Sequence, residues 1–474
     1  MDYREFIGNF LEEHRQEFTH ISDEIWGYAE PRFREYRSSA LQQEYMKDKG
    51  FSVRADLAGE ETAFIAEYGK GRPVIAFLGE FDSLSGLSQE ADVTVHTPIV
   101  EGGEGHGCGH NLLGTASLAA TVVLKAYMDK EGLEGTIRYY GCPAEENAGG
   151  KAYLVRDGYF DDCDIALTWH PGTINSVTGD SSLANFRVFF TFYGISSHAA
   201  GAPELGRSAL DAVELMDVGV NYLREHVISD ARIHYAITNS GGKAPNVVQS
   251  EAQVLYAIRA PKVSQVKEIY ERIKKIAQGA ALMTETDVDI KQVAAYSNSI
   301  PNDVIAANML ENLKYYVPSY TKEELAYAEG FKAVITDLDR AGLKETAINK
   351  FGREEGLRQY EKPIFDAIAP YRSGGVGKAS TDVGDVSWIV PTCECNTACW
   401  AAGTAGHSWQ VVAQGKSSIA YKGMLAAAKT MAATGFEFLT SPELVAKARE
   451  NWLEMLDGEK YPDPLPADAK PEMW

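Results

Sequence analysis

Continuous apolar runs of strand length alternate with a long helical pattern in the first part of the chain. The helical pattern LLGTASLAATVVLKAYMDK (112–130) stands in the middle of four such runs, TAFIAEYG, RPVIAFLGEF, TIRYYGCP and DIALTWHPG. Short apolar runs of this kind are typical of buried strands, and their alternation with helices is typical of α/β sheets. We therefore expect the α/β fold class, built on a sheet.

The order of the expected elements changes near residue 185. Strands are expected over 185–194, 231–240, 251–260 and 287–297, with helices over 206–227 and 262–280. The resulting order βαββαβ predicts a ferredoxin-like unit that is inserted into the sheet domain. Because 474 residues exceed the size at which one core keeps growing, two domains or more are expected. We assign residues 1–184 and 301–474 to the first domain and residues 185–300 to the inserted one.

The chain beyond residue 300 starts with a charged, helical stretch from 302 to 362. We expect STDVGDVSWIVPT (380–392) to return to the sheet as a strand, ahead of two closing helices. The Pro-rich tail YPDPLPADAKPEMW is expected to fray.

The charge balance excludes several classes of partner. The chain carries 45 Lys and Arg against 67 Asp and Glu, a formal net charge of −22, which repels polyphosphates and anionic membrane surfaces. No apolar stretch reaches membrane-spanning length, and MDYREFIGNFLEEHRQEF lacks the pattern of a signal peptide. We expect no nucleic-acid partner, no membrane partner and a cytoplasmic location. Six cysteines are too sparse for a disulfide scaffold, so reduced thiols are expected.

The stretch GHGCGHNLLG (105–114) places two histidines and a cysteine within five positions. Cys108 alone is open to three interpretations: a small buried hydrophobe, a nucleophile beside a histidine, or a metal ligand. Three other turns carry polar side chains at or near the expected sheet: CPAEENAGGK with Glu145 and Glu146, TWHPG with His170, and AAGTAGHSWQ with His407. Each alone is also compatible with an ordinary loop or core residue. Together they indicate a cleft at the ends of the strands.

The number of these side chains fits a two-metal site. Two divalent ions that share one anionic bridge, with two further protein ligands each, need five side chains. The candidates are Cys108, His110, Glu146, His170 and His407. A bridging thiolate would supply the negative charge of a bridging carboxylate, and Glu145, left uncoordinated, would accept the proton of a bridging water.

The ordered motifs GEFDSLSG, GHGCGHN, CPAEENAGGK, HPG, SSHAAGAPELGRSALDAVEL and GTAGHS resemble those of the M20 metallopeptidases, in the Cys-containing amidohydrolase branch. The resemblance covers nearly the whole chain. It implies a sheet-based binuclear metallohydrolase catalytic domain with an inserted dimerisation or lid domain.

The resemblance also implies roles for single residues. Cys108 would bridge the two metal ions. His110 and His170 would complete the coordination of one ion, and Glu146 and His407 would complete that of the other. Glu145 would be general base and then general acid. Asp82 would orient a ligating histidine, although its place in FDSLSG also suits a turn residue.

Some residues near these motifs lie outside the family pattern. Asn111 stands where members of this branch often carry Asp, which puts a charged role there in doubt. His106 is not assigned as a ligand. The cluster CECNTAC (393–399) fits no common zinc spacing, so we expect its thiols to face the core.

The inserted domain carries three residue types that contact substrate in related carboxypeptidases. The candidates are His198, Asn246 and Arg259. Arg259 would grip a substrate carboxylate bidentately, and a surface ion pair is the alternative. The resemblance implies a homodimer in which His198 acts on the neighbour's site and hydrogen-bonds the developing oxyanion, with a polar cap on the following turn as the alternative.

These observations predict a metal-dependent amidohydrolase that acts on an N-acyl amino acid with a free carboxylate. The resemblance first suggests N-(4-aminobenzoyl)glutamate, and other acyl amino acids or dipeptides are the alternative. We expect each chain to hold two divalent ions, zinc or manganese. The competing interpretations are a cysteine-nucleophile hydrolase and a non-catalytic member of a hetero-oligomer that contains a homologous subunit.

Overall fold

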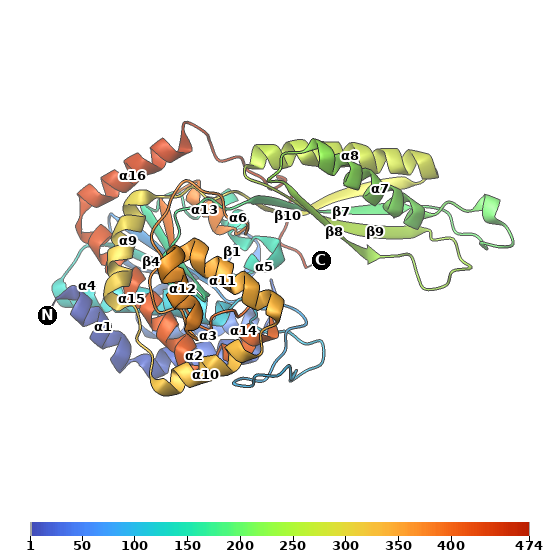
Figure 1. Cartoon of the computed structure of the whole chain (residues 1–474). Coiled ribbons are helices and arrows are strands. Elements are labelled where there is room, and N and C mark those ends of the chain that lie inside the picture. Colours follow the sequence, from blue (N-terminus) through green and yellow to red (C-terminus); the bar gives the residue numbers. More distant parts are fainter. Residues whose placement is uncertain (1, 474) are drawn as a thin grey trace.

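The structure is a computed structural model that describes residues 2–473 (Figure 1). A seven-stranded sheet forms the centre of its larger part, in the order β1-β2-β4-β3-β5-β11-β6. The strands are β1 (Ser52–Leu57), β2 (Glu60–Lys70), β3 (Val74–Glu80), β4 (Gly135–Cys142), β5 (Ile165–Gly172), β6 (Ser176–Val177) and β11 (Thr392–Ala398). The inner strands β4, β3, β5 and β11 are parallel, and β3 is buried along its whole length. The expected α/β class is confirmed.

Helices cover both faces of this sheet (Figure 1). The helices of the larger part are α1 (Tyr3–Glu13), α2 (Arg15–Tyr28), α3 (Tyr36–Asp48), α4 (His110–Glu131), α5 (Glu145–Ala148), α6 (Gly150–Arg156), α9 (Asp303–Tyr316), α10 (Lys322–Ala333), α11 (Asp337–Phe351), α12 (Arg353–Glu361), α13 (Val383–Ser387), α14 (Trp409–Gln414), α15 (Ser418–Thr440) and α16 (Pro442–Leu456). Helices α4 and α15 share one core with the sheet, and α6 and α13 pack on the opposite face. Within residues 2–473, no helix has the length and hydropathy to cross a bilayer.

The path of the chain through the sheet creates a cleft. From β3 the chain passes through α4 to β4 on one side, and then returns to β5 on the other side of β3. Ligands in open α/β sheets bind at the carboxyl ends of the strands where the order reverses in this way. The motifs that follow β3, β4 and β5 are therefore brought together at one edge.

A second, four-stranded sheet forms a unit that projects from the larger part (Figure 1). Its elements are β7 (Ala184–Tyr193), a short 3-10 helix (Pro203–Leu205), α7 (Ala209–Leu223), a second 3-10 turn (Arg224–His226), β8 (Arg232–Asn239), β9 (Glu251–Ala260), α8 (Val263–Thr284) and β10 (Asp287–Tyr296). The order β10-β7-β9-β8 with antiparallel neighbours confirms the predicted ferredoxin-like βαββαβ arrangement. The exact domain boundaries at 185 and 300 stay a prediction.

Two expectations about the last third of the chain are wrong. Residues 383–387 form helix α13 rather than a strand, and the strand begins only at Thr392. Gly384 lies so close to the carbonyl oxygen of Ser297 that a Cβ would collide with it. The Ser297 N–H donates to the Asp385 carboxylate, and this bond holds the segment against the end of β10. The helical turn thus bridges the two parts of the molecule.

The tail does not fray between residues 461 and 470. The Tyr461 hydroxyl donates to Asp385, the Gln292 side chain donates to the carbonyl of Pro464, and Arg156 donates to the carbonyl of Ala469. Leu465 is buried and belongs to the hydrophobic core that contains residues of the inserted unit and of α6. The residues of this core are distant from Leu465 in the sequence, so the composition of the tail alone does not indicate that it packs on the protein.

Candidate metal centre and active site

The carboxyl end of β3 fixes the first histidine. Asp82, two residues beyond the strand, is buried, and its Oδ1 lies 2.8 Å from Nδ1 of His110, the first residue of α4. Its Oδ2 accepts a hydrogen bond from the backbone N–H of Glu146 at 2.8 Å. With Nδ1 donating to the carboxylate, the lone pair of His110 lies on Nε2, which is buried, lies 3.3 Å from a Glu80 oxygen and forms no hydrogen bond within residues 2–473.

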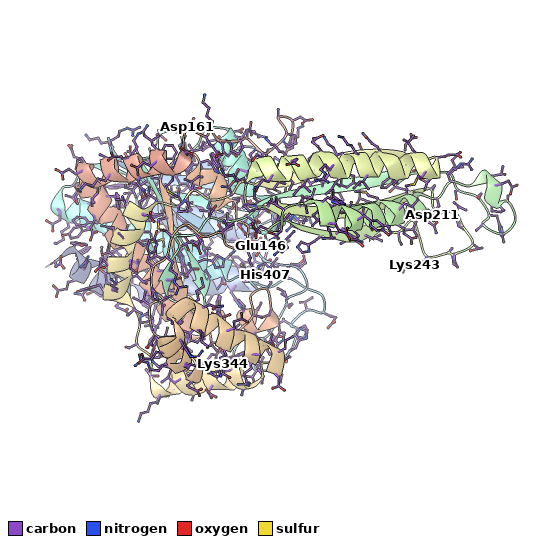
Figure 2. The ribbon with its side chains drawn as sticks, turned by 45° about the horizontal axis from the view of Figure 1, so that its top comes forward. Glu146, Asp161, Asp211, Lys243, Lys344 and His407 are labelled. Carbon is purple, nitrogen blue, oxygen red and sulfur yellow. The ribbon has the colours of Figure 1, made fainter. Side chains whose placement is uncertain are left out.

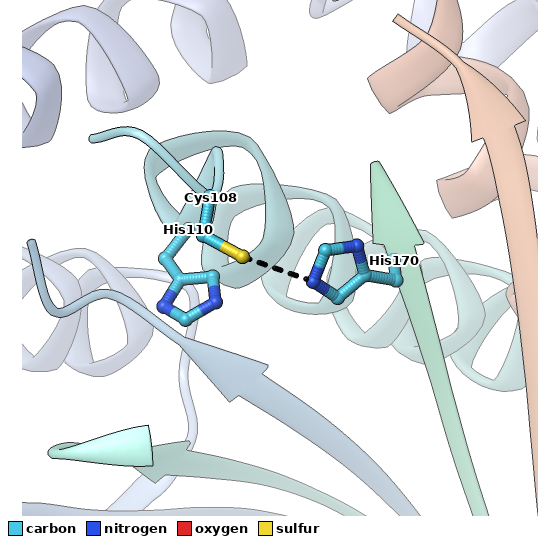
Figure 3. Close-up of side chains that lie close together, drawn as sticks. All are labelled: Cys108, His110 and His170. Atoms are coloured by element: carbon cyan, nitrogen blue, oxygen red, sulfur yellow. Dashed lines mark hydrogen bonds between the residues drawn. The ribbon is translucent and has the colours of Figure 1, made fainter. Parts of the chain in front are cut away.

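A tight turn places Cys108 beside this histidine (Figure 3). Gly109 has φ +79° at the start of α4, and a Cβ there would meet Trp400 at 2.5 Å and Pro171 at 2.9 Å. Only glycine fits this backbone and this space. Cys108 Sγ lies 3.4 Å from Nε2 of His170 at the end of β5, while Nδ1 of His170 lies 2.8 Å from its neighbour's carbonyl oxygen. Both histidines therefore present Nε2 toward the thiol.

A second pair of side chains closes the cluster from the other side. The turn after β4 has Ala144 at φ 58°, an uncommon conformation for a residue with a Cβ, and it directs Glu145 and Glu146 to the strand ends. His407 Nε2 lies 3.0 Å from Glu146 Oε1. The His407 backbone is also at positive φ, 54°, and its N–H donates to the carbonyl of Gly107 at 3.0 Å. The loop of His407 is thereby tied to the cysteine turn.

These donors fit two divalent ions. Two groups have all their donor atoms within 4.8 Å of one another: Cys108, His110 and His170 in the first, and Cys108, Glu146 and His407 in the second. Cys108 belongs to both, so the five side chains fall into the two sets expected of a thiolate-bridged pair. Thiolate, imidazole and carboxylate are the ligand types of zinc sites. The occupancy of these groups stays a prediction.

The pKa shifts of Cys108 and Glu145 bear on the roles that these two residues can have. Burial, reinforced by the charge of Glu146, raises the pKa of the Cys108 thiol, which is the opposite of what an activated cysteine nucleophile needs. Burial and the neighbouring carboxylates of Glu80 and Glu146 raise the pKa of Glu145 well above its ordinary value. A carboxyl group whose pKa is raised in this way is suited to accept a proton from a reacting group and pass it on.

Sequence reasoning missed a buried charged trio behind the cluster. Lys151, fully buried, forms ion pairs with Glu80 and, at 2.7 Å, with Asp382. Glu80 also stands 3.3 Å from Nε2 of His110 and forms a third close group with His110 and Glu145. The signal was present, because Glu80 and Lys151 are charged residues of the motifs GEFDSLSG and CPAEENAGGK. Neither motif shows that these charges meet.

A cavity of about 590 Å³ opens over the cluster. Its lining includes Cys108, Glu145, Glu146, His170 and His407 from the larger part. From the inserted unit it includes Asn185, Arg187, Arg259 and Tyr296. The structure thus brings Arg259, one of the predicted substrate-binding residues, to the same space as the metal-ligand candidates.

His198 and Asn246 lie elsewhere. They face each other across two loops of the inserted unit, joined by an isolated bridge between His198 and Val247 and by a hydrogen bond from the Ala199 N–H to the Asn246 carbonyl. Neither is among the described residues that line the cavity. Lys243, in the loop of Asn246, lies on the outer part of the unit, well away from Glu146 and His407 (Figure 2).

The remaining candidates have structural surroundings. His106 is buried with Nε2 2.9 Å from the carbonyl oxygen of Ile25, and burial lowers its pKa to about 4. Asn111 donates to the Ser22 hydroxyl, away from the cluster. The thiols of the 393–399 cluster are buried in the core as expected, and all six cysteines are free.

Comparisons with known proteins agree with this geometry. Residues 178–284 match the model of a peptidase dimerisation domain from the M20 family. The chain is 46% identical over 472 residues to an Escherichia coli K12 protein named as one subunit of p-aminobenzoyl-glutamate hydrolase, and the match covers 98% of each chain. The chain belongs to the M20 family. As an M20 protein with this relative, it is a hydrolase.

Two further M20-type relatives are more distant. A second Escherichia coli K12 protein, named as another subunit of the same hydrolase, is 29% identical over 261 residues, 52% of this chain and 59% of that protein. A Bacillus subtilis protein described as a dinuclear metal-binding peptidase from the M20 family superimposes with a TM-score of 0.54 at 15% identity, over 91% of this chain and 99% of that one. This last likeness supports the fold alone.

Proposed function

We propose that the chain is a binuclear metal-dependent amidohydrolase that releases an amino acid from its N-acyl derivative, with N-(4-aminobenzoyl)glutamate as the first candidate substrate. The observation that carries the proposal is the pair of ligand groups sharing Cys108, set beside Glu145 in one cavity with Arg259. The name of the 46% identical Escherichia coli relative supports the choice of acyl group and amino acid.

The proposed ligand sets are Cys108, His110 and His170 for one ion and Cys108, Glu146 and His407 for the other. Zinc or manganese suits this mixture of sulfur, nitrogen and oxygen donors. When bound, such ions polarise a carbonyl group and acidify water. Asp82 keeps Nε2 of His110 free for this role through its contact with Nδ1.

Glu145 carries the proton in this proposal. It lies next to a ligand, and its raised pKa lets it take a proton from the attacking water and pass it to the leaving amine nitrogen. Arg259 lies on the other wall of the cavity, where it would bind the carboxylate of the amino acid and hold the amide bond over the cluster.

We further propose that the inserted unit pairs with a second copy of the chain or with a homologous subunit. Its edge strand β8 is exposed along most of its length, including Tyr235 and Ile237. His198 and Asn246 would then reach the site of the neighbouring protomer, where His198 would donate a hydrogen bond to the developing oxyanion. The two Escherichia coli relatives are named as different subunits of one hydrolase, which keeps the hetero-oligomer open.

The proposal is tested by a substrate screen on the purified chain loaded with zinc or with manganese. The panel contains N-(4-aminobenzoyl)glutamate, other acyl amino acids and dipeptides, and release of the free amine is measured. The proposal expects the highest kcat/KM for N-(4-aminobenzoyl)glutamate. Turnover confined to dipeptides would show that the substrate is a dipeptide rather than N-(4-aminobenzoyl)glutamate. Absence of turnover, with and without a homologous subunit, would contradict the proposal.

A further inference from the structure

Two guanidinium groups share the face of the small sheet that looks toward the metal-ligand cluster. Strands β7 and β9 are antiparallel, with Asn185 opposite Arg259 and Arg187 opposite Ala257. Since opposite and alternate residues of a sheet share a face, Asn185, Arg187 and Arg259 lie together on one face. The intervening residues, Phe186 and Ile258, are buried on the other face beneath α7 and α8.

Several atoms of these polar groups have no partner in the part of the chain that the structure describes. Within residues 2–473, the Nε atoms of Arg187 and Arg259 and the Oδ1 atom of Asn185 are buried and form no hydrogen bond. Among residues 2–473, no carboxylate lies within 4.0 Å of either guanidinium. Burial, together with the charge of Arg187, lowers the pKa of Arg259. A carboxylate that enters the cavity would supply the missing hydrogen-bond partner of each guanidinium group.

The two arginines stand at different depths. Asn185 is opposite Arg259 of β9 and opposite Tyr296 of β10, and the Tyr296 hydroxyl donates to the backbone carbonyl of Glu145, so this row of the sheet lies beside the cluster. Arg187 is two residues farther along β7, away from the end at which the strand leaves the larger part. Arg259 is therefore closer to where an amide bond would be cleaved, and Arg187 is farther along the cavity.

We propose that Arg187 and Arg259 form a subsite for a dicarboxylic amino acid, with Arg259 on the α-carboxylate and Arg187 on the side-chain carboxylate. The α-carboxylate is attached next to the scissile nitrogen, which matches the position of Arg259, and the side-chain carboxylate extends away from it. The planar fork of each arginine can bind a carboxylate bidentately. This inference rests on the proposed function and assigns its selectivity to Arg187.

The test compares N-(4-aminobenzoyl)glutamate with N-(4-aminobenzoyl)glutamine, which differ in one charge at nearly equal size. The wild type is expected to prefer the glutamate substrate by about a hundredfold or more in kcat/KM, because loss of a buried charged partner leaves Arg187 unpaired. Arg187→Met should cut that preference at least about tenfold by lowering the glutamate value alone. Arg187→Lys, which keeps the charge without the fork, should retain part of the preference.

The matched control is Arg272→Met, which removes the same charge from α8 on the opposite side of the sheet, where Arg272 donates to the carbonyl of His226. It should leave both substrates unchanged. A preference that is equally strong in wild type and Arg187→Met, with Arg187→Lys agreeing, would overturn the assignment.

A binding measurement separates this inference from the proposed function. Calorimetry measures L-glutamate and L-glutamine binding to the metal-loaded wild type and to Arg187→Met. A glutamate preference that is lost in the variant supports the subsite even if no acyl amino acid is hydrolysed, a result that would refute only the proposed function. Equal binding of the two amino acids to the wild type would overturn the subsite.

Discussion

The metal-ligand cluster and the tip of the inserted unit are built in opposite ways. The cluster is assembled from residues that follow neighbouring strands of one sheet, and Asp82 and the backbone of Gly107 tie its turns together. His198 and Asn246 stand on the loops that follow β7 and β8, at the end of the second sheet away from the larger part. The metal-ligand candidates of one chain therefore meet within that chain, whereas we expect its His198 and Asn246 to act at the site of another chain.

The largest expected effect comes from removing the ions. Chelation should abolish hydrolysis, since the cluster would lose its means of polarising the substrate carbonyl. Activity after chelator treatment, and after readdition of zinc or manganese, checks this. Thiol alkylation is the comparison: an enzyme that resists chelators and is inactivated only by alkylation would restore the cysteine-nucleophile interpretation.

The next largest effects are expected when the two adjacent glutamates are substituted one at a time. Glu145→Gln should lower kcat by about a hundredfold or more and retain metal, because it removes only the proton carrier. Glu146→Gln should lower metal occupancy, because it removes a ligand. Elemental analysis beside kinetics distinguishes them, and equal loss of metal in both variants would show that the roles are misassigned.

A smaller loss of kcat/KM is expected from a substitution of Arg259, which lies in β9 and lines the cavity. Arg259→Ala should cost about 2 kcal/mol in transition-state binding, roughly 30-fold in kcat/KM, for substrates with a free α-carboxylate. Substrates with an amidated α-carboxylate should lose little more. Kinetics on both forms tests this. Equal losses would mean that Arg259 is structural.

The smallest expected loss of activity is the one that remains when two inactive variants, one at His198 and one at Glu145, complement each other in mixed dimers. His198→Ala and Glu145→Ala should each be nearly inactive, yet random reassociation of equal amounts should return about a quarter of wild-type activity. Half the dimers are then mixed, and each mixed dimer has one intact site of two. Exchange of protomers, followed by fluorescence energy transfer, is the control. Exchange without any return of activity would show that His198 does not act across the interface.

The cluster could be predicted from the sequence because its members lie at the carboxyl ends of strands or in the segments that follow them. Once β3, β4 and β5 are recognised as parallel, the residues after them meet at one edge, and Cys108, Glu146 and His170 are found by that rule. The βαββαβ order was recognisable for the same reason, since alternation and helical spacing are local.

Partners across the fold could not be predicted. Arg187 is one charge inside an apolar strand, and only the pairing of β7 with β9 shows that it shares a face with Arg259. Lys151 lies in an equally apolar helix, and its burial depends on Glu80 and Asp382, which lie far away in the chain. Local pattern gives no information on either contact.

The metal content of the purified chain tests the central claim most directly. Elemental mass spectrometry of the wild type should find close to two divalent ions per chain, and Cys108→Ser should weaken both together, because Cys108 belongs to both ligand groups. His170→Ala is the matched comparison and should affect one ion more than the other. A wild type with no bound metal, or a Cys108→Ser protein that keeps either ion at full occupancy, would contradict the thiolate-bridged pair.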